Sequence, residues 1–314
     1  MNQSKFSLAD VLTILTALGF GFICFLGTNF YTLGNIPKSI LTALIITILL
    51  FSAAFIAKLL KRTSVNFKSR FIVEMVLLVV FTLLLVLFTY MPFSHYFTVS
   101  AKRSIIVNKI KKSITQAENM FPEYELYAAN RMILYKSTLK SIIDNKDGNK
   151  SDYVKYGFQV DKSDEMQLNK KMENISATLF PTNYSDTVTQ KGLKEVANNW
   201  LLDAKGSLDW KPIGITNVVV DIESKSTGWL SMLIEMSNIK QKNESPKDFT
   251  YSLMPTDDIK QYFTKLEKVS NTSLLFAFLT WVLMILSWFV TKRHTRFPGF
   301  KLLFGKSGQS NNEL

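Results

Sequence analysis

The sequence predicts an α-helical integral membrane protein with four transmembrane helices, arranged three plus one around an α+β extracytoplasmic domain. The first observation is four apolar stretches without Asp, Glu, Lys or Arg, at 11–30, 39–57, 75–93 and 270–291. Each is close to the roughly 20 residues that cross about 30 Å of hydrocarbon. The second observation is that residues 94–269, between the third and fourth stretches, are mostly polar.

The apolar stretches define the expected spans and domains. Including flanking residues, we expect transmembrane helices at about 11–31, 39–57, 71–93 and 270–291. The first three make a membrane region at 1–93, which the fourth span joins. Residues 94–269 form the extracytoplasmic domain, and residues 292–314 form a basic tail.

Basic residues predict the orientation, because short cytoplasmic loops hold an excess of Lys and Arg. The link between the second and third spans has five basic residues and no acid. They are Lys58, Lys61, Arg62, Lys68 and Arg70. The tail has five more against a single Glu313, whereas the first link has only Lys38. We therefore expect a multi-pass protein of the plasma (inner) membrane with both termini cytoplasmic.

The chain is basic overall, with a formal net charge of +12. Residues 94–269 contain 25 basic and 22 acidic residues, which leaves 12 basic and 3 acidic residues elsewhere. Because the positive charge follows topology rather than one soluble face, nucleic acid is not expected as a partner. Membrane lipids are expected partners, since the tail mixes basic and aromatic residues. Other membrane or envelope proteins are expected as well.

Two acids lie at the starts of spans. Glu74 comes four residues after Arg70, and Asp10 directly precedes the first span. An interfacial or Arg-paired position is the simplest interpretation of Glu74, with ion coupling as the alternative. Asp10 has the same simple interpretation. In the first span, Thr13, Ala17 and Gly21 recur every four residues, which favours close helix packing.

The extracytoplasmic domain begins with helical periodicity. Ile106 to Ala117 predict one helix, and the apolar positions Leu126, Ala129 and Ile133 predict a second after Pro122. A third helix is expected from Ser163, with acids in its first turn, up to Pro181. A fourth is expected over 187–205, with Trp200 on its buried face.

After residue 214 the residue pattern becomes typical of β-strands. Val and Ile are abundant over 215–222, and apolar residues alternate over 230–236, which predicts two strands. A third strand is expected at 249–254. A last helix, capped by Thr256, is expected to run nearly straight into the fourth span. The domain has no cysteine, so its own apolar core must hold it together.

The residues available for catalysis are few. The only histidines are His95 and His294, and the only cysteine, Cys24, lies in the first span. A zinc site, a cysteine nucleophile or a Ser-His-Asp triad is therefore not expected. Ser137 and Lys140 match a Ser-x-x-Lys spacing without its companion motifs. We predict no catalytic, cofactor-binding or metal-binding residue and no cofactor, and the sequence does not identify ligand- or partner-binding residues.

These patterns favour a non-enzymatic cell-envelope protein. Its outer domain would bind a partner or ligand, as a sensor or scaffold subunit of a membrane complex. The order of spans is similar to that of tetraspanins, but the large loop of that family is rich in cysteine and this one has none. An accessory subunit of a transporter or secretion machine is the alternative. A membrane-bound enzyme acting on lipid or cell-wall material is a third possibility.

Overall fold

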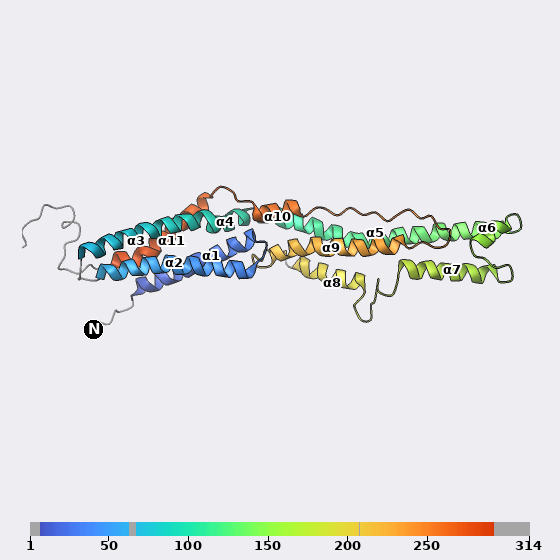
Figure 1. Ribbon diagram of the computed structural model, residues 1–314, viewed down its shortest axis with the longest axis horizontal. Coiled ribbons are helices and arrows are strands. Elements are labelled where there is room, and N and C mark those ends of the chain that lie inside the picture. The colour runs from blue at the N-terminus through green and yellow to red at the C-terminus, as the bar shows by residue number, and fades with distance from the viewer. Residues whose placement is uncertain (1–6, 63–66, 207, 292–314) are drawn as a thin grey trace, which may run out of the picture. The chain divides into compact units, whose positions relative to one another are not determined.

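A computed structural model describes residues 7–62, 67–206 and 208–291 (Figure 1). Within those residues the secondary structure is helical, without β-strands. The chain forms two compact units, which we call the membrane unit (Met1–Arg103 with Gln261–Leu314) and the helical unit (Ser104–Lys260). The α-helical membrane architecture predicted from the sequence is confirmed. The prediction of an α+β domain between the third and fourth spans is wrong, because the described residues of that domain are helical.

In the described residues of the membrane unit, five α-helices and one π-helical turn belong to the spanning region. They are α1 (Leu8–Tyr31), α2 (Ile36–Arg62), α3 (Phe67–Phe88), η1 (Thr89–Phe93), α4 (Ser94–Ala101) and α11 (Asn271–Val290). Among the residues that the structure describes, four stretches are long and apolar enough to cross a membrane, and the third runs from Arg70 to Ala101 through η1. The chain is therefore a multi-pass membrane protein.

Close helix contacts in the membrane unit depend on small residues. A Cβ atom added to Gly21 would lie 1.9 Å from the Thr47 hydroxyl of α2. A Cβ atom added to Gly27 would lie 2.1 Å from the backbone oxygen of Pro92 in η1. Glycine at 27 therefore permits an approach to the backbone that a side chain would block, and the close packing predicted at Gly21 is confirmed.

The helical unit is built on α5 (Arg103–Asp144), a single helix of 42 residues. Eight of its buried positions recur at alternating spacings of four and three. They are Ile110, Ile114, Ala117, Phe121, Tyr124, Ala128, Arg131 and Tyr135. The break predicted at Pro122 is wrong. Proline costs a helix interior about 3 kcal/mol, and burial of both flanking aromatic residues, Phe121 and Tyr124, offsets that cost.

Helix α9 (Ile215–Asn238) replaces the two strands predicted at 215–222 and 230–236. Seven of its buried positions also recur at alternating spacings of four and three. They are Ile215, Val219, Ile222, Ser226, Trp229, Leu233 and Met236. Phe121 of α5 packs on Trp229, with ring centroids 6.2 Å apart. Figure 1 shows α5 and α9 side by side and running in the same direction.

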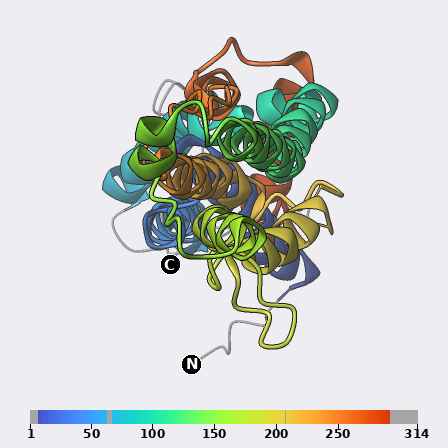
Figure 2. The same ribbon diagram turned by 90° about the vertical axis from the view of Figure 1, so that its right-hand side faces the viewer.

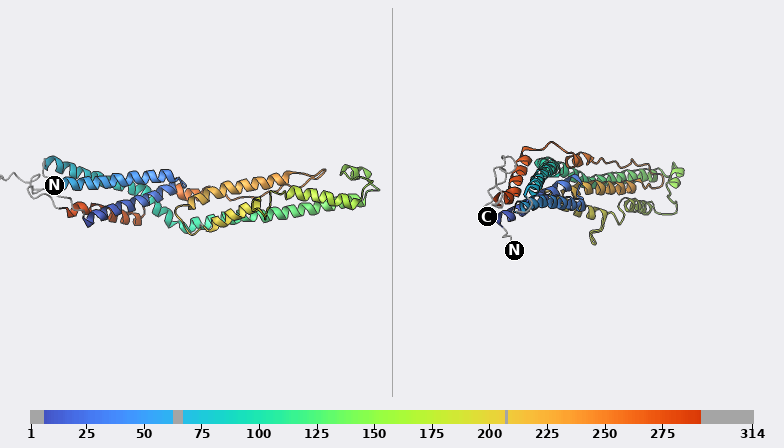
Figure 3. Two further views of the ribbon diagram at one scale, coloured as in Figure 1. Left: turned by 90° about the horizontal axis from the view of Figure 1, so that it is seen from below. Right: turned by 60° about the vertical axis from the view of Figure 1, so that its left-hand side comes forward.

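The third strand, predicted at 249–254, is absent. Those residues belong to a longer non-helical segment, residues 239–256, which we call the strap. It runs back along α5 (Figures 1 and 3). The hydroxyl of Tyr127 donates to the backbone oxygen of Lys247 at 2.8 Å, and the side-chain oxygen of Gln116 accepts from the backbone N–H of Met254 at 2.8 Å. Side chains of α5, rather than a neighbouring strand, therefore satisfy these polar backbone groups of the strap.

The remaining helices of the unit pack on this pair. They are α6 (Lys150–Lys155), α7 (Asp164–Leu179) and α8 (Leu193–Gly206). The predicted start of α7 is confirmed, because the Ser163 hydroxyl caps it by accepting from the Met166 N–H. Helix α8 begins at Leu193, later than expected, and Trp200 is half-buried with its ring 5.9 Å from that of Trp229. Figure 2 shows α5, α7 and α9 nearly end-on.

Helix α10 (Asp257–Thr264) is followed by a non-helical segment, 265–270, so the predicted continuous run into the fourth span is wrong. Glu223 of α9 accepts hydrogen bonds from the Thr256 hydroxyl and the Lys260 ammonium. The Lys260 bond and then the Thr256 bond lower the pKa of Glu223. These bonds fix the start of α10 against α9.

Candidate functional site: an ionic clasp in the membrane unit

Charged and polar side chains from all four spanning helices meet at one end of the membrane unit. We call this cluster the ionic clasp. Its members are Asp10 of α1, Lys58 and Lys61 of α2, Glu74 of α3, and Ser287 and Trp288 of α11. Ionisable groups inside a membrane bundle are rare, which makes this cluster the first candidate for a functional site.

Asp10 and Lys58 form the ion pair of the clasp. Their side chains are almost fully buried, and the Asp10 carboxylate accepts from the Lys58 ammonium and the Ser287 hydroxyl. Its second oxygen accepts from the backbone N–H and the hydroxyl of Ser7, both at 2.9 Å. Both carboxylate oxygens are therefore hydrogen-bonded, which offsets the large cost of removing the two charges from water.

Glu74 joins α3 to α11. Its side chain is fully buried and accepts from the Trp288 indole N–H at 2.8 Å. The Lys61 ammonium lies 4.1 Å from the centre of the Trp288 ring and donates to the Trp288 backbone oxygen at 2.7 Å. A cation over an indole face adds attraction that grows when the pair is shielded from water. Three helices therefore meet at one indole ring.

Asp10 and Glu74 lie at helix ends, where the sequence predicts interfacial or Arg-paired acids. Both side chains are also buried, and their hydrogen-bond partners include Lys58 and Trp288 respectively, which that prediction does not include. Lys58 was assigned to the basic link and instead lies within α2. The sequence does contain a pattern that predicts the Asp10–Lys58 pair, because the two residues lie 24 positions before and after Gly34. An antiparallel hairpin turning there places them at the same depth.

Apolar side chains fill the interior beyond the clasp. Phe20, Cys24, Leu50 and Phe81 belong to one buried cluster that draws on α1, α2, α3 and α11. Hydroxyl groups within this interior bond to backbone oxygens, as Thr13 does to Met284 and Thr280 to Phe276. The clasp therefore ties helix ends together, and a mainly apolar layer separates it from His95, whose Nε2 lies 2.6 Å from the Phe263 backbone oxygen.

A second buried ion pair, within the helical unit, joins the strap to α5. The Arg131 guanidinium donates to both carboxylate oxygens of Glu244, at 2.7 and 2.8 Å. It also donates to the backbone oxygens of Ser237 and Ile239, at 2.5 and 2.6 Å, where α9 ends. Burial alone would lower the pKa of Arg131, but the hydrogen bonds and charge of Glu244 outweigh it and raise that pKa.

The motifs weighed in the sequence do not converge on a reaction centre. Ser137 and Lys140 are both exposed on α5. Asp257 and Asp258 lie in the first turn of α10, as acids at a helix start commonly do. His294 and the tail 292–314 lie outside the described residues. Among the residues that the structure describes, no group of three or more His, Cys, Asp or Glu could hold a metal ion.

Comparisons with known proteins add no identification. No family model, no curated protein and no solved structure matches this chain.

Proposed function

We propose that this chain is a non-enzymatic subunit of a membrane complex whose helical unit binds a partner protein as a sensor or scaffold. The observation that carries the proposal is an exposed apolar stripe on α5. Its members are Leu126, Ile133 and Leu134, which are 57%, 64% and 69% exposed. The spacing of Leu126 and Ile133 predicts a helix, and their exposure on that helix is not evident from the sequence.

The stripe lies on the face of α5 that points away from the buried seam. Counting in sevens, Leu126 and Ile133 take the same heptad position as Lys112, Asn119 and Lys140. That outward position normally carries polar residues. Apolar side chains there gain nothing from packing within the helical unit. They suit the helix-in-groove or helix-on-helix contacts that proteins use for recognition.

The proposed orientation places the helical unit outside the cytoplasm. The clasp brings together the start of α1, the end of α2, the start of α3 and the end of α11. Lys61 and Arg62 of α2 and Arg70 of α3 belong to that end as well. The positive-inside rule favours that end as the cytoplasmic one. The chain then enters and leaves the helical unit on the opposite side of a plasma (inner) membrane.

The clasp also favours a second candidate, an accessory subunit of a transporter or secretion machine. Buried charges in spanning helices occur in such proteins, where they pair and respond to ions. The apolar layer beyond the clasp argues for an assembly role over a conduction role. In both candidates the exposed stripe is the docking surface.

Site-specific photo-crosslinking in cells tests the proposal. A photoreactive residue at Leu134 should give one discrete crosslinked species, and the additional substitution Ile133→Lys should remove it. The matched control, Lys140→Ser on the same helix face, should leave the crosslink intact. If Leu134 gives no crosslinked species, or one unaffected by Ile133→Lys, the stripe is not a docking surface.

A further inference from the structure

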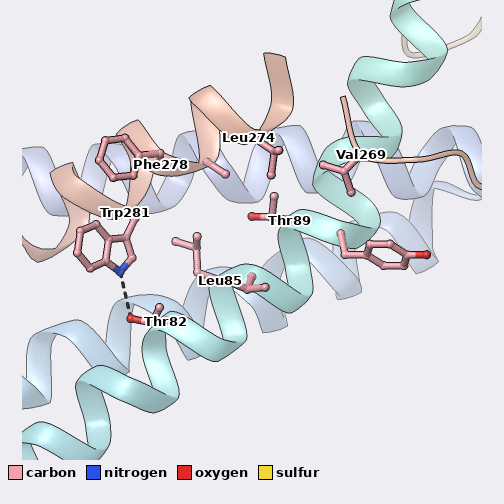
Figure 4. Close-up of a pocket in the computed structure, with 10 residues that line it drawn as sticks. Thr82, Leu85, Thr89, Val269, Leu274, Phe278 and Trp281 are labelled. Carbon is pink, nitrogen blue, oxygen red and sulfur yellow. Dashed lines mark hydrogen bonds between the residues drawn. The ribbon is translucent and has the colours of Figure 1, made fainter. Parts of the chain in front are cut away.

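A groove opens between α3 and α11 in the membrane unit. The Trp281 indole N–H donates to the Thr82 hydroxyl at 3.0 Å and bridges the two helices at one end of the groove (Figure 4). From this bridge a cavity of about 430 Å³ extends past Leu85 and Ala277 towards Tyr90. Its walls are almost entirely carbon, so it suits a hydrocarbon occupant.

One hydroxyl breaks this apolar lining. Thr89 is 5% exposed, and its hydroxyl has no hydrogen-bond partner within the described part of the chain. Thr82 and Thr280, by contrast, each donate to the backbone oxygen four residues earlier. Thr89 begins the π-helical turn and makes no such bond. A buried hydroxyl without a partner is costly, which points to an acceptor supplied by a ligand.

The depth of Thr89 fits a lipid ester. A helix rises 1.5 Å per residue, so the 20 residues from Arg70 to Tyr90 span about 30 Å, the thickness of the hydrocarbon core. Arg70 therefore marks one boundary of the hydrocarbon, and Tyr90, 61% exposed, marks the other. Tyrosine is typical of that boundary. The ester carbonyls of glycerolipids lie at the same level.

The shape and lining of the groove suit a single hydrocarbon chain. Between Thr82 and Tyr90 the groove is about 12 Å long, from eight residues at 1.5 Å each. A hydrocarbon chain can lie along this length against the apolar side chains and needs no backbone partners. A helix of another chain is the alternative occupant, which the crosslinking test below distinguishes.

We propose that this groove binds one acyl chain of a membrane glycerolipid, with the ester carbonyl accepting a hydrogen bond from the Thr89 hydroxyl. The chain runs from Thr89 towards the Trp281–Thr82 bridge. This lipid would be held at a defined site, unlike the lipids that contact exposed residues such as Leu83. The proposal uses residues of the membrane unit only and is independent of the partner proposed for the exposed stripe.

Photo-labelling of the full-length protein tests this site. The protein is reconstituted in phosphatidylcholine vesicles that contain a trace of phosphatidylcholine with a diazirine in its acyl chain, and labelled peptides are mapped by mass spectrometry. We expect labelling concentrated at Leu85 and Leu274. As the fraction of diazirine lipid in the vesicles is raised, labelling in the groove should saturate, whereas labelling at Leu83 should keep rising in proportion.

Two variants make the assignment specific. Thr89→Val keeps the shape of the side chain and removes the hydroxyl, so labelling in the groove should fall about three- to tenfold, the effect of one hydrogen bond. Leu274→Trp fills the rim and should reduce labelling at Leu85 about tenfold or more, while labelling at Leu83 stays constant. A melting temperature for each variant checks its fold.

Three outcomes would overturn the proposal. The first is equal labelling of groove and exposed residues, which would mean ordinary surrounding lipid. The second is groove labelling that both variants leave unchanged. The third is a protein-to-protein crosslink from a photoreactive residue at Leu85, which would mean that a helix of another chain fills the groove.

Discussion

Removing Arg131 should release the strap from the helical unit. In Arg131→Met the apolar stem remains, but the Glu244 carboxylate, whose side chain is 6% exposed, loses its charge partner. Two backbone oxygens at the end of α9 lose their donors as well. Breaking a buried ion pair from one side typically costs about 3 to 5 kcal/mol. Most of this penalty applies here because both side chains are almost fully buried.

Limited proteolysis with trypsin measures this release, because Lys240 and Lys242 lie within the strap. At about 1.4 kcal/mol per tenfold change, a loss of about 3 kcal/mol raises the open fraction of the strap about 100-fold. Cleavage follows the open population when opening and closing are fast. In the full-length protein, cleavage after these lysines should therefore accelerate about 100-fold in Arg131→Met.

The matched control is an exposed ion pair. Lys205 and Glu118 pair at 2.6 Å with side chains 38% and 44% exposed. Such a pair contributes at most about 1 kcal/mol, so Lys205→Met should change strap cleavage less than about fivefold. Equal strap cleavage in Arg131→Met and in the unsubstituted protein would refute the argument that the buried pair holds the strap.

Two further predictions concern packing and pH. Gly21→Ala should lower the melting temperature of the membrane unit, because the new Cβ meets the Thr47 hydroxyl. Combining Gly21→Ala with Thr47→Ala removes that hydroxyl and should recover most of the lost melting temperature. If the double variant shows no recovery, this contact is not the cause. The pKa of Glu223 is lowered by Lys260 and Thr256, so its stabilising effect is present above pH 4.5 and lost as pH falls through the lowered pKa. The stability advantage over Glu223→Gln should therefore shrink below pH 4.5 in denaturant titrations, and an advantage that grows there would contradict the assignment.

The four spans were predictable because hydrocarbon thickness fixes both length and composition. The start of α7 was predictable because Ser163 and the following acids satisfy helix-end N–H groups locally. Helix α9 was not predicted. Val218, Val219 and Val220 favour strands by propensity, but the heptad spacing of the buried positions decides the structure through packing.

The contacts of the ionic clasp could not be predicted for a different reason. Each of its residues has an ordinary explanation when considered alone, since acids and lysines are common near membrane boundaries. The pairing of Asp10 with Lys58 depends on the contact between α1 and α2. In the sequence, only the equal separation of the two residues from Gly34 indicates this pairing. Contacts with Ser287 and Trp288 join α1 and α3 to α11, more than 200 residues away. Periodicity within one helix carries no information about such contacts.

The most direct test of the account is the accessibility of two engineered cysteines in intact cells. Cys24→Ala first removes the native thiol. Val188→Cys places a probe at a position of the helical unit that is 91% exposed, and Asn66→Cys, outside the described residues, places one in the link between the second and third spans. The account predicts that a membrane-impermeant thiol reagent labels Val188→Cys and not Asn66→Cys until the membrane is permeabilised. Labelling of Asn66→Cys alone in intact cells would contradict it.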